Sequence, residues 1–163
     1  MSLKENPGEV FTKPIQIGVL VRDLDKTLEN LENIFGIGPF RIVDYPPEGE
    51  DNLVMEYNGE PADFTAKFCF FDLGNIELEL IQPLSGKTVW SDYLDRHGDG
   101  IHHIKFDIPR HDELKEYMDE NGVAMTQSGS AVGKNAGKTW AYYGTEDLIG
   151  FAIEVMNRLD EKA

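Results

Sequence analysis

The nine residues from Gly100 to Ile108 read G-I-H-H-I-K-F-D-I and predict a short, half-buried strand. Three apolar side chains alternate with three polar ones, namely Ile104, Phe106 and Ile108 with His103, Lys105 and Asp107. One face of such a strand covers a core, and the other face can carry chemistry. An imidazole fixed on a strand is well placed to bind a metal ion or to transfer a proton. The partners of His103 across the fold therefore decide its role.

Composition limits the classes of protein that the chain can represent. It has 163 residues, of which 40% are hydrophobic, which is enough for one domain with a proper core. The net charge is −15 and the isoelectric point is about 4.5, so nucleic acids and anionic membrane surfaces are poor candidate partners. The single cysteine, Cys69, permits no internal disulfide, and the chain begins without an apolar targeting segment. We therefore expect a cytoplasmic protein.

One pattern of elements occurs twice along the chain. The first copy is predicted to contain a strand, a helix and three strands, at 15–21, 23–36, 40–45, 64–72 and 76–82. The second copy repeats this order at 101–108, 112–121, 122–126, 138–143 and 151–156. A short helix at 88–97 joins the copies, and residues 46–61, rich in Pro, Gly and acidic residues, predict a mobile loop or a ragged hairpin. Such duplication fixes which elements face each other.

The repeat predicts the α+β class, with two βαβββ modules that pair into an open, cup-shaped mixed sheet. Neither module is large enough to be stable alone, but two sheets packed side by side can share a core. The expected organisation is an N-terminal extension, a first module, a bridging helix, a second module and a tail, at 1–13, 14–86, 87–98, 99–158 and 159–163.

Alignment of the two copies places four polar side chains at related positions. Gln16 and His103 open the first strand of each copy, and Glu79 and Glu154 lie in the last strand of each copy. The offsets between these pairs are 87 and 75 residues, and the long first-copy segment around 46–61 can absorb the difference. A pseudo-twofold axis would bring all four toward one cleft. One imidazole nitrogen and three oxygen donors suit a divalent ion such as Zn, Co, Ni, Mn or Fe.

The motif W-S-D-Y-L-D-R-H-G-D-G-I-H-H-I-K-F-D-I, preceded by E-L-I-Q-P-L, carries a family resemblance. Over residues 14–158 the chain resembles the vicinal oxygen chelate (glyoxalase/bleomycin resistance) superfamily, and it is most similar to methylmalonyl-CoA epimerases. The resemblance implies a glyoxalase-like fold and one divalent metal ion held by Gln16, Glu79, His103 and Glu154. Epimerases usually have His at the first of these positions, and a Gln-Glu-His-Glu set instead resembles the zinc-type glyoxalase I.

The resemblance also implies a reaction. In this family the metal ion polarises a substrate carbonyl, a carboxylate removes a proton from the neighbouring carbon, and reprotonation gives an epimer or isomer. The resemblance gives Glu154 the role of base. Where epimerases carry a catalytic glutamate, the best register of F-T-A-K-F-C-F places Lys67, which could act as a second base or bind a substrate oxygen. Glu56 would take this position if the register slipped.

Other positions depart from the epimerase pattern. Epimerases usually have a His-Pro-Lys turn before the last strand and glyoxalases an Asp-Pro-Asp-Gly turn, whereas this chain has Gly-Thr-Glu-Asp at 144–147. In the Gly-rich loop nearby, Lys134 and Lys138 could contact a phosphate, and Trp140 could line a substrate cleft. His102 is expected to point to the opposite face from His103 and to be structural.

The function that the sequence favours is a metal-dependent epimerase or isomerase of the methylmalonyl-CoA epimerase kind. A lactoylglutathione lyase like glyoxalase I is the alternative enzyme. A non-catalytic protein that binds a small molecule, as resistance proteins of this superfamily do, is the alternative outside catalysis. The expected partner is thus an acyl-CoA or a glutathione adduct, and homodimers are common in the family.

Overall fold

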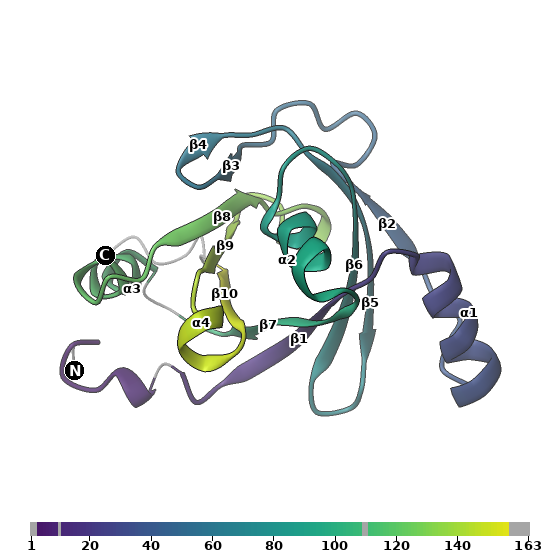
Figure 1. Ribbon diagram of the computed structural model, residues 1–163, viewed down its shortest axis with the longest axis horizontal. Coiled ribbons are helices and arrows are strands. Elements are labelled where there is room, and N and C mark those ends of the chain that lie inside the picture. Colours follow the sequence, from purple (N-terminus) through teal and green to yellow (C-terminus); the bar gives the residue numbers. More distant parts are fainter. Residues whose placement is uncertain (1–2, 10, 109–110, 157–163) are drawn as a thin grey trace.

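The strands that open the two copies, β1 (Pro14–Leu20) and β7 (Gly100–Phe106), are antiparallel neighbours in the middle of a ten-stranded mixed sheet (Figure 1). The computed structural model describes residues 3–9, 11–108 and 111–156. The last strands of the copies, β6 (Glu77–Ser85) and β10 (Ala152–Met156), lie parallel to β1 and β7 on either side. The sheet curls, and the predicted α+β class with one open mixed sheet is confirmed.

The other strands extend the sheet in both directions. They are β2 (Ile42–Tyr45), β3 (Met55–Tyr57), β4 (Glu60–Pro61), β5 (Thr65–Asp72), β8 (Met125–Ser130) and β9 (Thr139–Tyr143). The order across the sheet is β2-β5-β6-β1-β7-β10-β9-β8-β3-β4. The helices are α1 (Leu24–Phe35), α2 (Val89–His97), α3 (His111–Glu120) and α4 (Glu146–Ile149), with 3-10 turns η1 (Pro7–Glu9) and η2 (Gly133–Asn135). The proposed tail at 159–163 lies outside the described residues.

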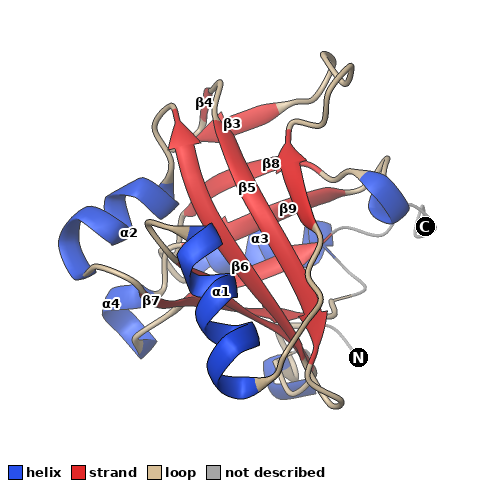
Figure 2. Cartoon of the chain, turned by 90° about the vertical axis from the view of Figure 1, so that its right-hand side faces the viewer, coloured by secondary structure: helices blue, strands red, loops and turns tan. Residues whose placement is uncertain are grey.

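Local sequence signals define both ends of α1. The Asp23 side chain accepts a hydrogen bond from the Lys26 backbone N–H, and Gly36 ends the helix with φ of 66°. Helix α1 lies against the convex face of β5 and β6 (Figure 2). Its Leu24 and Leu28 belong to one buried apolar cluster with Cys69 of β5 and Leu80 of β6. This face of the sheet is therefore closed by α1, and the chemistry must lie on the other face.

The concave face is filled by aromatic side chains. The bridging helix α2 begins at a capping box made by Thr88 and Ser91 and inserts the fully buried Trp90 into the curl of the sheet. Around Trp90 the rings pack at centroid distances of 5.4 to 6.1 Å, and they belong to Phe64, Phe68, Trp140 and Tyr142. This cluster forms the core of the cup.

The segment 46–61 is more ordered than the expected loop. Asn58 and Gly59 have φ of 50° and 79°, which a two-residue hairpin turn requires, and they join β3 to β4. The hairpin pairs with β8 of the second copy, so the long insertion of the first copy extends the sheet edge of the second. The expected strand at 122–126 is shifted to β8, whose polar sequence M-T-Q-S-G-S lacks the alternation that marks a strand.

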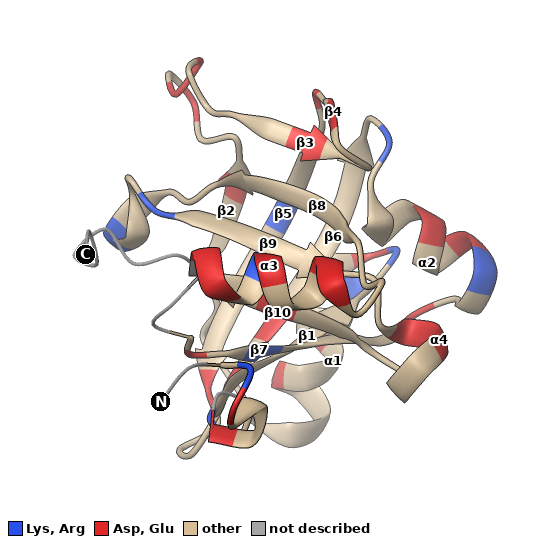
Figure 3. Ribbon diagram, turned by 90° about the vertical axis from the view of Figure 1, so that its left-hand side faces the viewer, with Lys and Arg blue, Asp and Glu red and all other residues tan. Residues whose placement is uncertain are grey.

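Charge and hydropathy of the outer surface agree with the composition. In the ribbon of Figure 3, Asp and Glu positions are marked on α2, α3 and α4, and Lys and Arg positions are fewer and scattered. Among the described residues, no helix is long and apolar enough to cross a membrane.

Candidate metal centre

Gln16 and His103 occupy equivalent positions of β1 and β7. In the antiparallel pair Gln16 lies opposite Lys105, and Gly18 lies opposite His103. A twofold axis between the two strands therefore exchanges Gln16 with His103 and Gly18 with Lys105. This register agrees with the offset of 87 residues that the sequence alignment used.

Glu79 and Glu154 obey the same axis. Gly18 of β1 lies beside Glu79 of β6, and Lys105 of β7 lies beside Glu154 of β10. Because Gly18 and Lys105 are equivalent, Glu79 and Glu154 are equivalent too. The duplication thus delivers one carboxylate to each side of the central strand pair.

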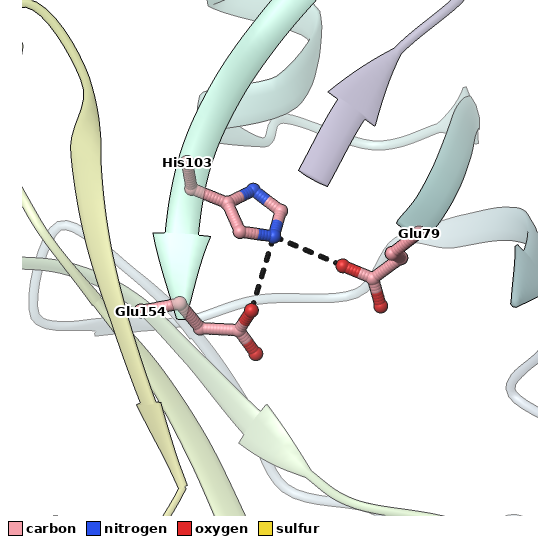
Figure 4. A group of neighbouring side chains, drawn as sticks. All are labelled: Glu79, His103 and Glu154. Atoms are coloured by element: carbon pink, nitrogen blue, oxygen red, sulfur yellow. Dashed lines mark hydrogen bonds and ion pairs between the residues drawn. The ribbon is translucent and has the colours of Figure 1, made fainter. Parts of the chain in front are cut away.

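Three side chains meet at one point above this strand pair. Nε2 of His103 lies 3.0 Å from Oε2 of Glu79 and 3.0 Å from Oε2 of Glu154 (Figure 4). The ligand atoms of the triad all lie within 4.8 Å of one another, and no member is more than 5% exposed. The triad is therefore a buried set of one nitrogen and two carboxylate donors.

One carboxylate oxygen of the triad is left without a hydrogen-bond donor, so it is available to bind a cation. One imidazole nitrogen carries a single proton or a single lone pair, so it cannot satisfy two carboxylates at once. Within the described residues, the contact with Glu79 has hydrogen-bond geometry, whereas the buried Oε2 of Glu154 has no hydrogen-bond partner. Two carboxylate oxygens and one imidazole nitrogen, once the ring gives up its proton, are a donor set that Zn²⁺ and related ions prefer.

Gln16 lies on the same strand pair, with a free carbonyl oxygen. Its side chain is buried, and Nε2 donates a hydrogen bond to Oε1 of Glu77 over 2.6 Å. Its Oε1 is buried and has no hydrogen-bond partner in the described part of the chain. The carboxamide oxygen is thus available to a cation, and its role as fourth ligand stays a prediction.

Gly18 is a component of the site that the sequence analysis missed. A Cβ at this position would lie 1.8 Å from Cε1 and 2.0 Å from Nε2 of His103, so the imidazole lies directly on the glycine backbone. A glycine inside an alternating strand often marks such a close approach. Gly18 in the strand Q-I-G-V-L-V was therefore a visible sign in the sequence that another group approaches the backbone closely there.

The sequence predicts that His102 points to the opposite face from His103, but in the structure the two rings lie side by side. The strand pairing slips by one residue, because Gly18 lies opposite His103 while Val19 lies opposite Ile101. His102 is therefore the extra residue of a β-bulge, which redirects its side chain. The ring is buried, and its Nδ1 lies 3.1 Å from Nδ1 of His103.

The contacts of His102 continue to the turn before the last strand. Its Nε2 lies 3.6 Å from Oε1 of Glu146 at the start of α4, and burial lowers its pKa, so the ring is neutral. A neutral His102 can accept the Nδ1 proton of His103, which leaves Nε2 of His103 as a lone pair for a metal ion. The acidic turn that departs from the epimerase pattern thus supports the histidine behind the ligand.

We expect His102→Phe to weaken the binding of Zn²⁺ by about 10- to 100-fold, because His103 would lose the acceptor that fixes its tautomer. Calorimetric titration of the metal-free protein measures this. His97→Phe is the matched control, since His97 is exposed on α2. Equal affinities of the His102→Phe variant and the wild type would contradict the role of His102.

The two carboxylates of the triad differ in charge environment. Burial and the charge of Glu154 raise the pKa of Glu79. Burial alone would also raise the pKa of Glu154, but Lys105 and His103 outweigh it and hold this pKa below its ordinary value. The Nζ of Lys105 lies 3.2 Å from Oε1 of Glu154. The surroundings therefore favour the ionised form of Glu154 more than that of Glu79.

The metal-free protein should lose stability as the pH rises from 6.5 to 9. Burial alone would lower the pKa of His103, but Glu154 and Glu79 outweigh burial and raise the pKa to about 9. The charged imidazole thus stabilises the fold fully below its ordinary pKa of about 6.5, and this contribution disappears as the pH passes 9. The free energy of unfolding should fall by about 3 kcal/mol in all.

Urea unfolding at pH values below and above this window measures the loss. A divalent ion should reverse it at the higher pH, because the ion binds the deprotonated ring. A free energy of unfolding that stays constant across the window would show that the carboxylates do not hold the imidazole.

The structure does not bring Lys67 to the triad. On β5, Ala66 and Phe68 belong to the concave core, so Lys67 points to the convex face with Cys69. The residue of β5 opposite Glu79 is Phe70. Lys67 therefore lies on the opposite face of β5 from the aromatic core, and its role as a second base stays a prediction.

The remaining predicted residues lie outside the triad. Glu56 is on β3, where its Oε2 accepts a hydrogen bond from Ser128. Lys134 is exposed in η2, and Lys138 donates to Oδ1 of Asn135. Trp140 lies within the aromatic cluster of the cup, 7% exposed. The contacts described for Glu56, Lys138 and Trp140 do not involve the triad, and the roles of these residues stay predictions.

Comparisons with known proteins agree with this architecture. The model of the Glyoxalase/Bleomycin resistance protein/Dioxygenase superfamily matches residues 15–143. An uncharacterized Bacillus subtilis protein, YqjC, is 29% identical over 130 residues, which cover 78% of this chain and 91% of that protein. Its likeness extends over most of both chains.

Solved structures share the fold at low sequence identity. The hypothetical protein BH1468 from Bacillus halodurans has a TM-score of 0.61 with 21% identity, covering 93% of this chain and 97% of that one. Methylmalonyl-CoA epimerase from Mycobacterium tuberculosis has a TM-score of 0.56 with 20% identity, at 90% and 87% coverage. The Streptomyces coelicolor epimerase with 2-nitronate-propionyl-CoA has a TM-score of 0.57 with 19% identity, at 91% and 98% coverage.

Proposed function

Because the chain belongs to the glyoxalase/bleomycin resistance protein/dioxygenase superfamily, we propose that it is a metal-dependent isomerase that moves a proton next to a substrate carbonyl. The observation that carries this proposal is the buried triad, in which both carboxylates lie 3.0 Å from one imidazole nitrogen. Glu79, His103 and Glu154 would hold a divalent ion, with Gln16 as a further ligand. Such an ion would supply Lewis-acid polarisation of the carbonyl.

The protein side chains have separate tasks in this proposal. Glu154, beside Lys105, accepts the proton from the carbon next to the carbonyl and later releases it to solvent, while a solvent proton added to the opposite face of that carbon gives the epimer. Glu79 remains a ligand on the opposite side of His103. The aromatic cluster around Trp90 and Tyr142 excludes water, because these rings pack against the site, with Tyr142 at a centroid distance of 4.9 Å from His103.

We propose methylmalonyl-CoA as the first substrate to test, and with it a cytoplasmic enzyme that acts on an acyl-CoA. The fold shared with methylmalonyl-CoA epimerases supports this choice, and one of those structures holds an acyl-CoA analogue. The experiment is incorporation of solvent deuterium into methylmalonyl-CoA by metal-loaded protein. Incorporation supports the proposal, and its absence with active conversion of the methylglyoxal–glutathione hemithioacetal would favour the second candidate.

The second candidate is a lyase like glyoxalase I. The buried carboxamide of Gln16 supports it, because its unpaired oxygen would be a neutral ligand where epimerases usually have an imidazole. A metal assay separates both enzymes from a resistance-type binding protein. Protein with substoichiometric metal, and no gain in substrate affinity on addition of Co²⁺ or Zn²⁺, would contradict both enzyme proposals.

A further inference from the structure

Lys105 is a buried lysine in the middle of the candidate metal centre. Its side chain is 8% exposed, and its Nζ lies 3.2 Å from Oε1 of Glu154. Lysine is almost never fully buried unless it is paired. The strand alternation of G-I-H-H-I-K-F-D-I already placed Lys105 on the face of His103, although the sequence analysis gave it no role.

The ammonium group lies among several carboxylates. Its partner Glu154 lies 3.0 Å from Nε2 of His103, and that nitrogen lies 3.0 Å from Glu79. Lys105 is also the β7 residue opposite Gln16 and beside Glu154. It therefore lies on the same strand and face as His103, beside the strand that carries Glu154.

The internal twofold shows what Lys105 replaces. Its equivalent in the first copy is Gly18, which leaves the space that the His103 ring occupies. By the same axis, a small residue at 105 would leave space for the side chain at 16. Position 105 carries a lysine instead, and Nε2 of Gln16 donates a hydrogen bond to Oε1 of Glu77. At these equivalent positions the two copies thus differ by one buried positive charge, which Lys105 carries in the second copy.

We propose that Lys105 is a resident cation of the centre, which competes with a divalent ion for Glu154 and leaves that carboxylate a single oxygen for the ion. The inference rests on the proposed function in so far as it assumes that the triad binds metal. Lys105 holds Oε1 of Glu154, while Oε2 faces His103. Lys105 is therefore a positioning residue. With Lys105 present, the triad binds a divalent ion more weakly and releases it faster than the same triad would without this charge.

Calorimetric titration of metal-free protein with Zn²⁺ tests the competition. Lys105→Met keeps the length of the side chain and removes the charge, so the affinity should rise by about tenfold or more because the repulsion of the ion is lost. Lys26→Met is the control for net charge, since Lys26 is exposed on α1, and its Kd should equal that of the wild type. An affinity of Lys105→Met equal to or weaker than that of the wild type overturns the inference.

Thermal unfolding of the metal-free variants separates this inference from the proposed function. Lys105→Met should lower the Tm by about 5 to 10 °C, because Glu154 loses its buried partner. The double variant Lys105→Met/Glu154→Gln should recover most of that loss, since it removes both charges. If neither the wild type nor Lys105→Met binds Zn²⁺, the proposed function fails, and the Tm values alone decide whether Lys105 is a resident cation.

The same double variant covers the case in which Lys105→Met does not fold. Folding of the double variant then supports the pairing of Lys105 with Glu154. Failure of both variants to fold, or an unchanged Tm of Lys105→Met, overturns the inference.

Discussion

Glu154→Gln should lower the rate of solvent deuterium exchange into the substrate by about 100- to 10,000-fold. The substitution keeps the shape of the side chain but removes the charge that accepts a proton. Glu154 is the member of the triad whose pKa is held below its ordinary value, after burial is outweighed by Lys105 and His103. It is therefore the triad carboxylate best suited to act as a base. Exchange followed by mass spectrometry measures the rate under metal saturation.

Lys67→Ala provides the comparison. Lys67 lies on the convex face of β5, away from the triad, so its removal should reduce exchange by less than about tenfold. Equal losses in the two variants would give Lys67 a catalytic role after all. Full exchange by Glu154→Gln, in protein with its metal bound and its fold intact, would exclude Glu154 as the base.

Gly18→Ala should abolish the metal centre. The added methyl group would lie 1.8 Å from Cε1 of His103, so the imidazole must leave its position between the two carboxylates. Overpacking of this kind costs about 1 to 3 kcal/mol. With the nitrogen ligand displaced, we expect the affinity for Zn²⁺ to fall at least about 100-fold, which corresponds to about 3 kcal/mol.

Gly8→Ala is the matched control for this substitution. A Cβ at Gly8 would make only an ordinary contact, 3.6 Å from Oδ1 of Asn6. Titration with Zn²⁺ and urea unfolding of both variants give the two readouts. Wild-type affinity in Gly18→Ala would show that His103 is not a ligand. Loss of stability with unchanged affinity would restrict Gly18 to a packing role.

The part of the candidate site that follows from the sequence repeat could be predicted, because equivalent strands of the two copies carry equivalent side chains. Gln16, Glu79, His103 and Glu154 follow from aligned strands, and the register of the sheet relates them by one axis. The superfamily was identified correctly from the G-I-H-H-I-K-F-D-I motif. Both results rest on patterns that recur along the chain.

Errors arose where the local pattern was ambiguous. In F-T-A-K-F-C-F both faces of the strand carry apolar side chains, because β5 is covered by the aromatic core on one side and by α1 on the other. Alternation then cannot tell which face Lys67 takes. The strand β8 was shifted for a similar reason, since Gln127 and Ser128 are polar and yet buried.

The sequence by itself determined the duplication, the α+β class and the alternation that sets His103 and Lys105 on one face of a strand. Only the tertiary structure decided that His102 turns toward His103, that Gly18 makes room for the imidazole and that Lys105 pairs with Glu154. The reason is that alternation is a property of one strand, whereas a bulge, a close approach and a buried ion pair depend on the register with strands distant in sequence.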